Sequence, residues 1–298
     1  MSMVINHNMM AANAARNLSD SYGALATSTR RLSSGLRITT AADDAAGLAI
    51  RELMRSDIST LNQGVRNAND AISMIQTADG ALQVIDEKLI RMKELAEQAA
   101  TGTYTSDQRL IIDSEYQAMA SEITRIASAT DFNGIYLLNG NLSSSVHNGG
   151  NLTPQGKLKV HFGTGNASSE DYYYIQIGTS TASAFGLGLG AASTSAGGRS
   201  ISTQDLAQQA LDAITAAIVS KDKIRANLGA LQNRLENTIS NLQIQAENLQ
   251  SAESQISDVD VATEMTEFVR NQILTQAAVA MLSQANSLPK MAMQLISG

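Results

Sequence analysis

The last stretch of the chain, residues 261–296, decides the fold and reads VATEMTEFVRNQILTQAAVAMLSQANSLPKMAMQLI. Its apolar residues recur at alternating steps of four and three, the spacing that keeps one stripe of a helix against a partner helix. Nothing close by in the sequence can bury this stripe, so we expect a long helix that needs another helix beside it. The stripe consists of Leu274, Ala278, Met281, Ala285, Leu288, Ala292 and Leu295.

The first residues of the chain carry a matching stripe. Two amphipathic arms at opposite ends of one chain predict an antiparallel closure, in which the two terminal helices pack side by side. The residues between the arms then extend away from this helix pair and return to it. We place the arms at residues 1–43 and 257–298. The stripe of the first arm is formed by Leu18, Tyr22, Leu25, Thr29, Leu32 and Leu36.

Two more amphipathic stretches predict long helices between the arms. The first follows the hydroxyls and carboxylates of residues 39–44, which suit a helix start, and extends to about residue 99. Its apolar seam passes through Val65 and Ile72 and changes phase near residues 77–80, where we expect a bend or local unwinding. The second covers residues 202–256 and repeats an apolar residue every seven positions, at Leu228, Leu235, Leu242, Leu249 and Ile256.

The middle of the chain is expected to hold a shorter helix and a little β-structure. Thr105 and Gln108 predict a capping box, and the helix that follows should fold back antiparallel. Residues 141–199 are rich in Gly, Ser, Thr and Asn, and only residues 157–162 and 172–177 look like strands.

We therefore predict a mainly α fold, an antiparallel long-helix coiled-coil bundle formed by the N- and C-terminal halves with a small β-containing outer insertion. The terminal arms form one part of it. Residues 44–140 and 200–256 form a helical rod, and residues 141–199 form a short outward-facing insertion.

Composition excludes several classes of protein. A net charge of −7 over 298 residues, without a basic cluster, argues against nucleic-acid binding. The chain has no Cys, which excludes disulfides and thiol chemistry. No run approaches the roughly 18 apolar residues of a membrane span, and residues 1–15 make a poor secretory signal, so we expect no membrane insertion and, if the protein is exported, another route.

No catalytic, cofactor or metal site is visible in the sequence. His7, His147 and His161 are too scattered for a metal site, and Asp43 and Asp44 are better explained as helix-start residues than as a catalytic pair. We expect no enzyme activity and no cofactor.

Several motifs near both ends resemble those of bacterial flagellin. Residues 31–38 read RLSSGLRI and residues 43–50 read DDAAGLAI. Near the other end, VATE at 261–264, QILTQA at 272–277 and QAN at 284–286 precede Pro289. The resemblance covers about residues 1–140 and 200–298.

This resemblance implies a structural subunit that polymerises with copies of itself into the flagellar filament used for swimming. It also implies an extracellular location, reached through the flagellar type III export apparatus, with an export chaperone and a filament cap as partners. Two alternatives are a hook–filament junction protein of the same family and a secreted adhesive module displaying Tyr172, Tyr173 and Tyr174.

Residues 89–96, LIRMKELA, are similar to the family segment recognised by Toll-like receptor 5. Carried over by position, the implied contacts of this innate immune receptor are Arg91, Leu95 and Glu115. The alternative interpretation is that these are ordinary seam and surface residues of a bundle helix.

Overall fold

A computed structural model describes residues 8–147, 156–167, 170–188 and 198–297, and the mainly helical fold predicted from the sequence is confirmed. The helices are α1 (Met9–Ser34), α2 (Ala45–Ala100), α3 (Ser106–Ala129), α4 (Gln204–Ser257) and α5 (Val261–Ser297). The strands are β1 (Asp131–Phe132), β2 (Ile135–Tyr136), β3 (Leu158–His161) and β4 (Tyr172–Ile175).

The chain divides into two compact units, which are described separately. Unit 1 comprises residues Met1–Ile58 and Glu247–Gly298, and unit 2 comprises residues Ser59–Ala246. Unit 1 contains α1 and α5, whereas unit 2 contains α3, all four strands and most of α2 and α4.

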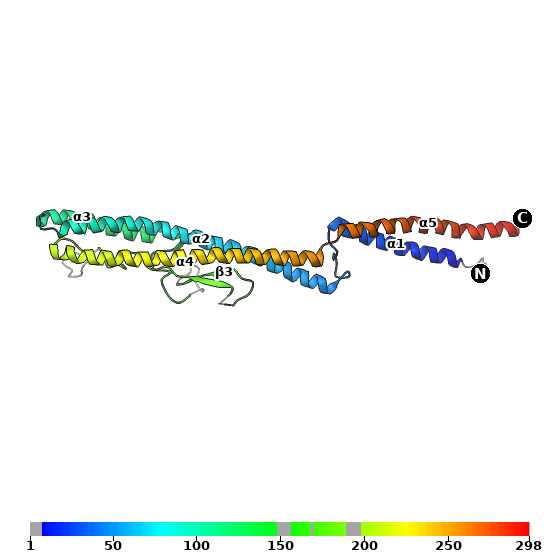
Figure 1. Cartoon of the computed structure of the whole chain (residues 1–298), viewed down its shortest axis with the longest axis horizontal. Helices are drawn as coiled ribbons and strands as arrows, with labels where there is room; N and C mark the ends of the chain where they lie inside the picture. Colours follow the sequence, from blue (N-terminus) through cyan, green and yellow to red (C-terminus); the bar gives the residue numbers. More distant parts are fainter. Residues whose placement is uncertain (1–7, 148–155, 168–169, 189–197, 298) are drawn as a thin grey trace. The chain divides into compact units, whose positions relative to one another are not determined.

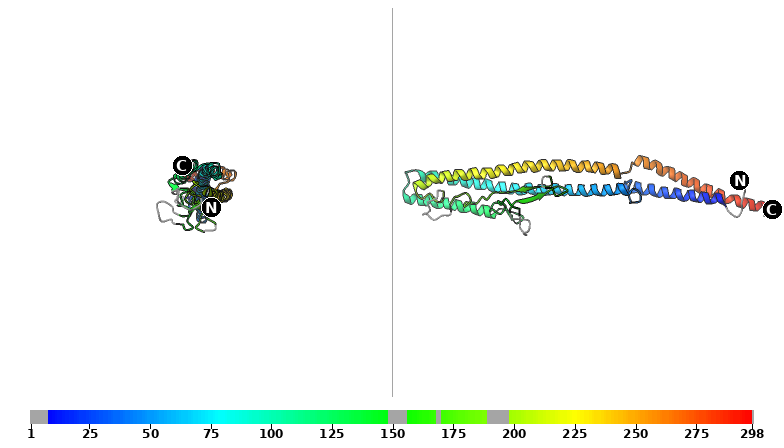
Figure 2. Two further views of the ribbon diagram at one scale, coloured as in Figure 1. Left: turned by 90° about the vertical axis from the view of Figure 1, so that its left-hand side faces the viewer. Right: turned by 90° about the horizontal axis from the view of Figure 1, so that it is seen from below.

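Unit 2 has a three-helix core in which α2, α3 and α4 lie side by side (Figures 1 and 2). Helix α4 buries the residues of the predicted seven-residue repeat that fall within this unit, Leu228, Leu235 and Leu242. Helix α3 starts at the predicted capping box of Thr105 and Gln108. It adds Tyr116, Ala120, Ile123 and Ala127 to the core, all of them fully buried.

The local unwinding expected near residues 77–80 does not occur, since α2 is helical without interruption from Ala45 to Ala100. Ala78 is fully buried and lies three residues after Ile75 and four before Leu82. The buried residues of α2 therefore continue through this region at steps of three and four. The prediction was wrong because it followed the larger Val65 and Ile72, which are only half-buried. The true seam consists of Leu61, Gly64, Ala68, Ala71, Ile75, Ala78, Leu82, Ile85, Leu89, Met92, Ala96 and Ala99.

In the described residues, the strands form two antiparallel pairs, β1 with β2 and β3 with β4. The turn between β1 and β2 has positive φ at both Asn133 and Gly134, as a type I′ hairpin turn requires. Strands β3 and β4 pair Val160 with Tyr173, and they lie where strands were predicted, with shorter bounds.

The β3–β4 hairpin is anchored on two helices of unit 2. On α2, Asn67 Nδ2 donates a hydrogen bond of 2.8 Å to the carbonyl oxygen of His161. On α4, the guanidinium carbon of Arg234 lies 3.6 Å from the ring centroid of Tyr173. Tyr173, the middle of the three consecutive tyrosines, thus packs the hairpin against α4.

Candidate assembly interface

Helices α1 and α5 of unit 1 pack side by side, as the predicted closure of the two arms requires (Figures 1 and 2). The less exposed residues of each helix recur at steps of three and four and mark the two faces that meet. On α1 these residues are Ala11, Ala14, Leu18, Ser21, Leu25, Ser28 and Leu32. On α5 they are Glu264, Phe268, Asn271, Thr275, Ala278, Leu282 and Ala285.

The seam between these helices is small and polar. Ser28, Glu264 and Thr275 are among its most buried members, with 4%, 9% and 7% exposure. Among the described residues of unit 1, Ile38 and Ala285 are the only hydrophobic residues that are buried. Helices depend on the burial of apolar faces for most of their stability, so this pairing leaves unit 1 without an adequate core.

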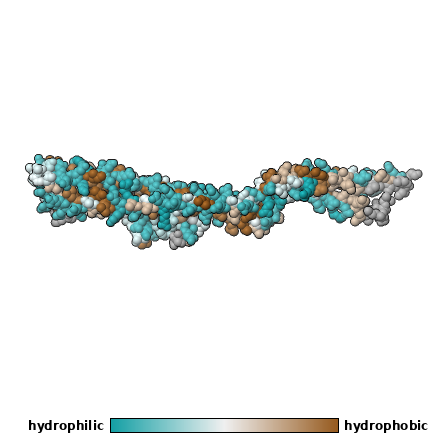
Figure 3. Space-filling model, in the orientation of Figure 1, coloured by the Kyte–Doolittle hydropathy of each residue, from teal (hydrophilic) through white to brown (hydrophobic). Residues whose placement is uncertain are grey.

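The large apolar residues of α5 lie mostly outside the seam. Val261, Ile273 and Met281 are 59%, 59% and 61% exposed. Hydrophobic side chains are visible on the surface of the α1 and α5 pair in Figure 3. Such a group of exposed apolar side chains is a candidate interaction surface. We call it the α5 apolar surface, formed by Val261, Met265, Val269, Ile273, Leu274, Val279 and Met281.

The link from α1 to α2 is clamped to the link from α4 to α5 by backbone hydrogen bonds. Gly35 ends α1 with a φ of 73°, and its carbonyl oxygen accepts from Val259 N at 3.0 Å. Arg37 N donates to the carbonyl oxygen of Ser257 at 2.7 Å, and Arg37 Nη2 donates to that of Ile256 at 2.7 Å. Both connections of unit 1 are thereby held together.

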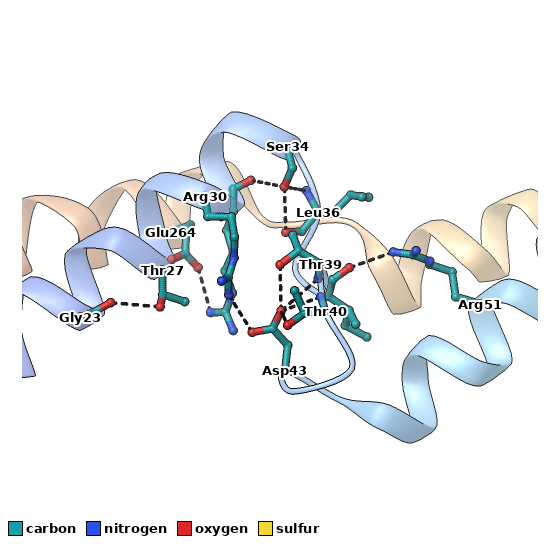
Figure 4. A network of polar contacts seen from close by, with 12 residues as sticks. Gly23, Thr27, Arg30, Ser34, Leu36, Thr39, Thr40, Asp43, Arg51 and Glu264 are labelled. Carbon is teal, nitrogen blue, oxygen red and sulfur yellow. Dashed lines mark hydrogen bonds and ion pairs between the residues drawn. The ribbon is translucent and has the colours of Figure 1, made fainter.

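Asp43 is the centre of a polar network in the same region (Figure 4). Its carboxylate accepts hydrogen bonds of 2.8 to 3.1 Å from the hydroxyl and backbone amide groups of Thr39 and Thr40. Arg30 Nη2 lies 3.0 Å from its other oxygen. The hydroxyl of Thr39 and the two backbone amides hold the pKa of Asp43 far below its ordinary value.

Two cations of α1 and α2 complete the network. Arg31 Nη1 lies 3.5 Å from Glu264 Oε2 at the start of α5. Arg51 Nη1, in a residue with 8% exposure, donates to the carbonyl oxygen of Ile38 at 2.8 Å. Next to Asp43, Asp44 Oδ1 accepts from Gly47 N at 2.9 Å and so starts α2, as helix-start chemistry predicted.

Comparison with known protein families identifies the chain. Residues 5–143 match the bacterial flagellin N-terminal helical region, and residues 211–296 match the bacterial flagellin C-terminal helical region. The chain belongs to the bacterial flagellin family. It is therefore a structural protein of the flagellar filament and not an enzyme.

Curated relatives match this flagellin over its whole length. It is 40% identical to a flagellin of Halalkalibacterium halodurans, over 99% of this chain and 100% of that protein. It is also 40% identical to flagellin FlaB2 of Treponema pallidum, again over 99% of this chain and 100% of the relative. The chain is also similar to the crystal structure of Bacillus cereus flagellin, with 26% sequence identity and a TM-score of 0.46. The match covers 63% of this chain and 94% of the Bacillus cereus chain.

The flagellin structure divides the predicted assembly residues between two surfaces. Leu18, Leu25 and Leu32 are half-buried in the α1–α5 seam, whereas Tyr22, Leu274 and Met281 are exposed. Leu36 lies beyond the end of α1 and forms an isolated β-bridge with Asp258. The side chains of Leu288 and Leu295 lie outside the described part of the structure.

Sequence reasoning found only part of the inner face of α5. The predicted stripe shares Ala278 and Ala285 with the face packed on α1, but it missed Asn271, Thr275 and Leu282 of that face. Steps of three and four also connect these residues with Ala278 and Ala285, but a stripe containing Asn and Thr gives a weak hydrophobic signal.

The residues implied as receptor contacts occupy two different environments in unit 2. Arg91 Nη2 lies 2.8 Å from Glu115 Oε1, and both side chains are about half exposed. Leu95 is 1% exposed and belongs to the helical core. Arg91 and Glu115 thus form one accessible pair between α2 and α3, and recognition by Toll-like receptor 5 stays a prediction.

The described residues form neither a metal cluster nor a membrane-spanning helix. In the residues with assigned positions, no three His, Cys, Asp or Glu side chains gather as a metal site would require. Among the described helices, none has the length and apolarity needed to cross a membrane.

Replacing Asp43 by Asn is expected to loosen the link between α1 and α2. The folded pKa of Asp43 is lowered, so its ionised carboxylate contributes stability that is fully present above its ordinary pKa of 3.8 and is lost as the pH falls below it. Hydrogen exchange of residues 37–43 should therefore be faster in the variant at pH 7, and the difference should shrink below about pH 4.

Asp44→Asn is the matched control, because Asn caps a helix about as well as Asp. Equal protection of residues 37–43 in the Asp43 variant and the unmodified protein at pH 7 would show that the network does not hold this link.

Proposed function

We propose that this flagellin polymerises into the flagellar filament through unit 1, whose α1 and α5 complete their apolar burial against other copies of the chain. One observation carries the proposal: unit 1 buries few hydrophobic residues by itself, while the α5 apolar surface is exposed. Complete burial of an Ile or Met side chain contributes about 1.5–3 kcal/mol, so several half-exposed residues together supply a substantial driving force.

The contacts between copies are heterologous in this proposal. Different surfaces of neighbouring subunits meet, and a rotation that does not close a ring generates a helical filament. Residues 1–43 and 257–298 form the inner tube, residues 44–140 and 200–256 form the next shell, and residues 141–199 face outward. The small seam residues of α1 and α5 support this placement because they allow several helices to approach closely.

Membership of the flagellin family supports a route to the outside of the cell. We infer that the chain is exported unfolded through the flagellar type III apparatus, with an export chaperone, and assembles beneath a filament cap.

The proposal is tested by placing a charge on the α5 apolar surface. Ile273→Asp removes a side chain that is 59% exposed in the single chain, so the fold of the monomer should change little. In the filament, the new carboxylate would be buried without a partner, which costs several kcal/mol. The critical concentration for polymerisation should rise by at least about 100-fold, which is equivalent to a loss of about 3 kcal/mol.

Ile273→Leu is the matched control, because it keeps an apolar side chain of equal size and should polymerise normally. Sedimentation measures the critical concentration, and electron microscopy shows the product. Normal filaments from Ile273→Asp would contradict an assembly role for this surface. Short assemblies from the unmodified protein, with no long filaments, would favour the hook–filament junction alternative.

A further inference from the structure

The three consecutive tyrosines of β4 each hold a cation over the ring. Lys159 Nζ lies 3.6 Å from the ring centroid of Tyr172, and Lys157 Nζ lies 6.0 Å from that of Tyr174. Arg234 of α4 holds the corresponding place on the tyrosine between them. Such cations are attracted to the electron-rich face of an aromatic ring. The hairpin and α4 thereby bring three positive charges together.

These cations are not neutralised by carboxylates. None of the ion pairs between described residues includes Lys157, Lys159 or Arg234. By contrast, the buried Lys221 of α4 lies 2.5 Å from Asp86 Oδ1. A cation that lies on an aromatic ring keeps its full positive charge, so the three cations of the hairpin region can still bind an anion.

Three carboxylates near the hairpin do not pair with these cations. Asp171 accepts hydrogen bonds of 3.3 and 2.6 Å from backbone amides in the connection between β3 and β4. Glu170, beside it, is exposed. Asp70 of α2 lines the same hollow as Lys159 but forms no ion pair with it. The hairpin region therefore carries a local positive charge on a chain whose net charge is −7.

Two of the cations and two of the tyrosines share one face of the hairpin, which we call the outer face. Lys159 lies directly opposite Tyr174 in the strand register. Lys157 and Tyr172 are each two residues away from this pair and so extend the same face. The rings of Tyr172 and Tyr174 are 5.4 Å apart and meet edge to face. Tyr173 belongs to the opposite face, which is the one packed on α4.

A groove of about 570 Å³ continues from the outer face onto α4. Tyr174 and Gln176 line it on the hairpin, and Asn227, Leu231 and Arg234 line it on the helix. The amide and guanidinium groups can hydrogen-bond to hydroxyl and anionic groups, and Leu231 offers an apolar contact. Tyr174, which is 39% exposed, joins the groove to the outer face.

We propose that the outer face and this groove bind an acidic polysaccharide. The cations pair with its carboxylate or sulfate groups, the tyrosine rings pack on the C–H groups of its sugar rings, and the groove amides bind its hydroxyls. We call this the polysaccharide site, formed by Lys157, Lys159, Tyr172, Tyr174, Asn227 and Arg234.

The combination of groups favours a polysaccharide over other anions. Three cations are fewer than the row of phosphate contacts on which nucleic-acid binding depends, and the negative charge of the whole chain opposes a long polyphosphate backbone. A sugar chain offers a charge, hydroxyls and an apolar ring face in every few units, as this site requires. Binding of such a ligand goes beyond polymerisation.

The first experiment uses the full-length chain as a monomer. Calorimetric titration with a heparin oligosaccharide, which is sulfated and carboxylated, should show binding that weakens as the salt concentration rises. A neutral dextran oligosaccharide should not bind. Failure to bind the heparin oligosaccharide would overturn the proposal, and tighter binding of single-stranded DNA of equal charge would identify the site as one for nucleic acids instead.

The second experiment removes the charges of the outer face. Lys157→Gln with Lys159→Gln should raise the Kd for the heparin oligosaccharide about 10-fold, as expected for two lost exposed charge contacts. Lys93→Gln with Lys223→Gln is the matched control, because it removes two exposed lysines of the same unit outside the site. Equal losses in both double variants would overturn the proposal, since binding would then follow net charge alone.

A third variant leaves the hairpin unchanged and places a carboxylate in the groove. Asn227→Asp keeps the size of an exposed side chain of α4 and should raise the Kd about fivefold, because the new charge repels the bound anion. Asn233→Asp makes the same change at an exposed position of α4 outside the groove and should bind normally. Unchanged binding by Asn227→Asp would overturn the placement of the ligand in the groove even if the lysine variants failed to fold.

Display of the site on the filament is tested separately, because it rests on the proposed function, in which residues 141–199 face outward. Filaments of the unmodified chain should co-sediment with a labelled heparin oligosaccharide. The variant with both Lys157 and Lys159 replaced should form normal filaments that co-sediment with less of it. Binding by the monomer and none by filaments would overturn the display of the site, whereas an absence of filaments would contradict the polymerisation proposal and not the binding site.

Discussion

Removal of residues 254–298 is expected to abolish polymerisation and to leave unit 2 folded. The deletion takes away all of α5, including its apolar surface and the partners of Arg31 and Arg37 in the clamp. Unit 2 should survive because its buried residues belong to residues 59–246 and pack on one another.

Sedimentation and electron microscopy under salt conditions that polymerise the full chain provide the measurement. The truncated chain should stay in the supernatant and should also fail to extend filament seeds. Circular dichroism and protease protection of residues 59–246 serve as the folding control. Normal filaments from the truncated chain would contradict an assembly role for the C-terminal arm.

Replacing two glycines of α2 by Ala is expected to change stability in opposite directions. A Cβ at Gly64 would overlap the carbonyl oxygen of Phe162, whereas one at Gly80 would meet no atom within 4 Å. Gly64→Ala should therefore lower the free energy of unfolding by about 1–3 kcal/mol, the usual cost of overpacking. Gly80→Ala should raise it by about 0.5–1 kcal/mol, because Ala is the better residue inside a helix.

Chemical denaturation measures both changes, and each variant is the control for the other. Hydrogen exchange adds a local readout, since residues 157–177 should exchange faster in Gly64→Ala and normally in Gly80→Ala. Stabilisation by Gly64→Ala with unchanged exchange in the hairpin would show that Gly64 is not needed for the close approach of Phe162.

Local sequence patterns predicted much of the architecture. Seven-residue spacing identified α4 through Leu228, Leu235 and Leu242, and the Thr105 and Gln108 pair identified the start of α3. Alternating steps at the two ends predicted that the arms would pair. These features are encoded within a few residues or by a strict period, so no knowledge of distant contacts is needed.

The choice of buried face depended on contacts that no local pattern contains. Gly64 lies in the core because the backbone of Phe162 approaches it closely, and Ala78 is also fully buried. The low hydrophobicity of such small residues does not predict their burial. On α5 the predicted stripe included the large residues Leu274 and Met281, which are exposed, whereas Thr275 and Ala285 are buried on the face next to α1. In the proposed assembly, other copies of the chain bury these larger apolar side chains.

The sequence by itself determined which segments are helical, which ends pair and to which family the chain belongs. Helical periods and family motifs are contained in consecutive residues of the chain. Only the tertiary structure decided which residues of α5 are left exposed, why Gly64 must lack a side chain, and that Lys221 is paired inside the core. Those properties arise between segments that lie tens to hundreds of residues apart, where the free energy depends on which atoms meet across the interface and which remain in water.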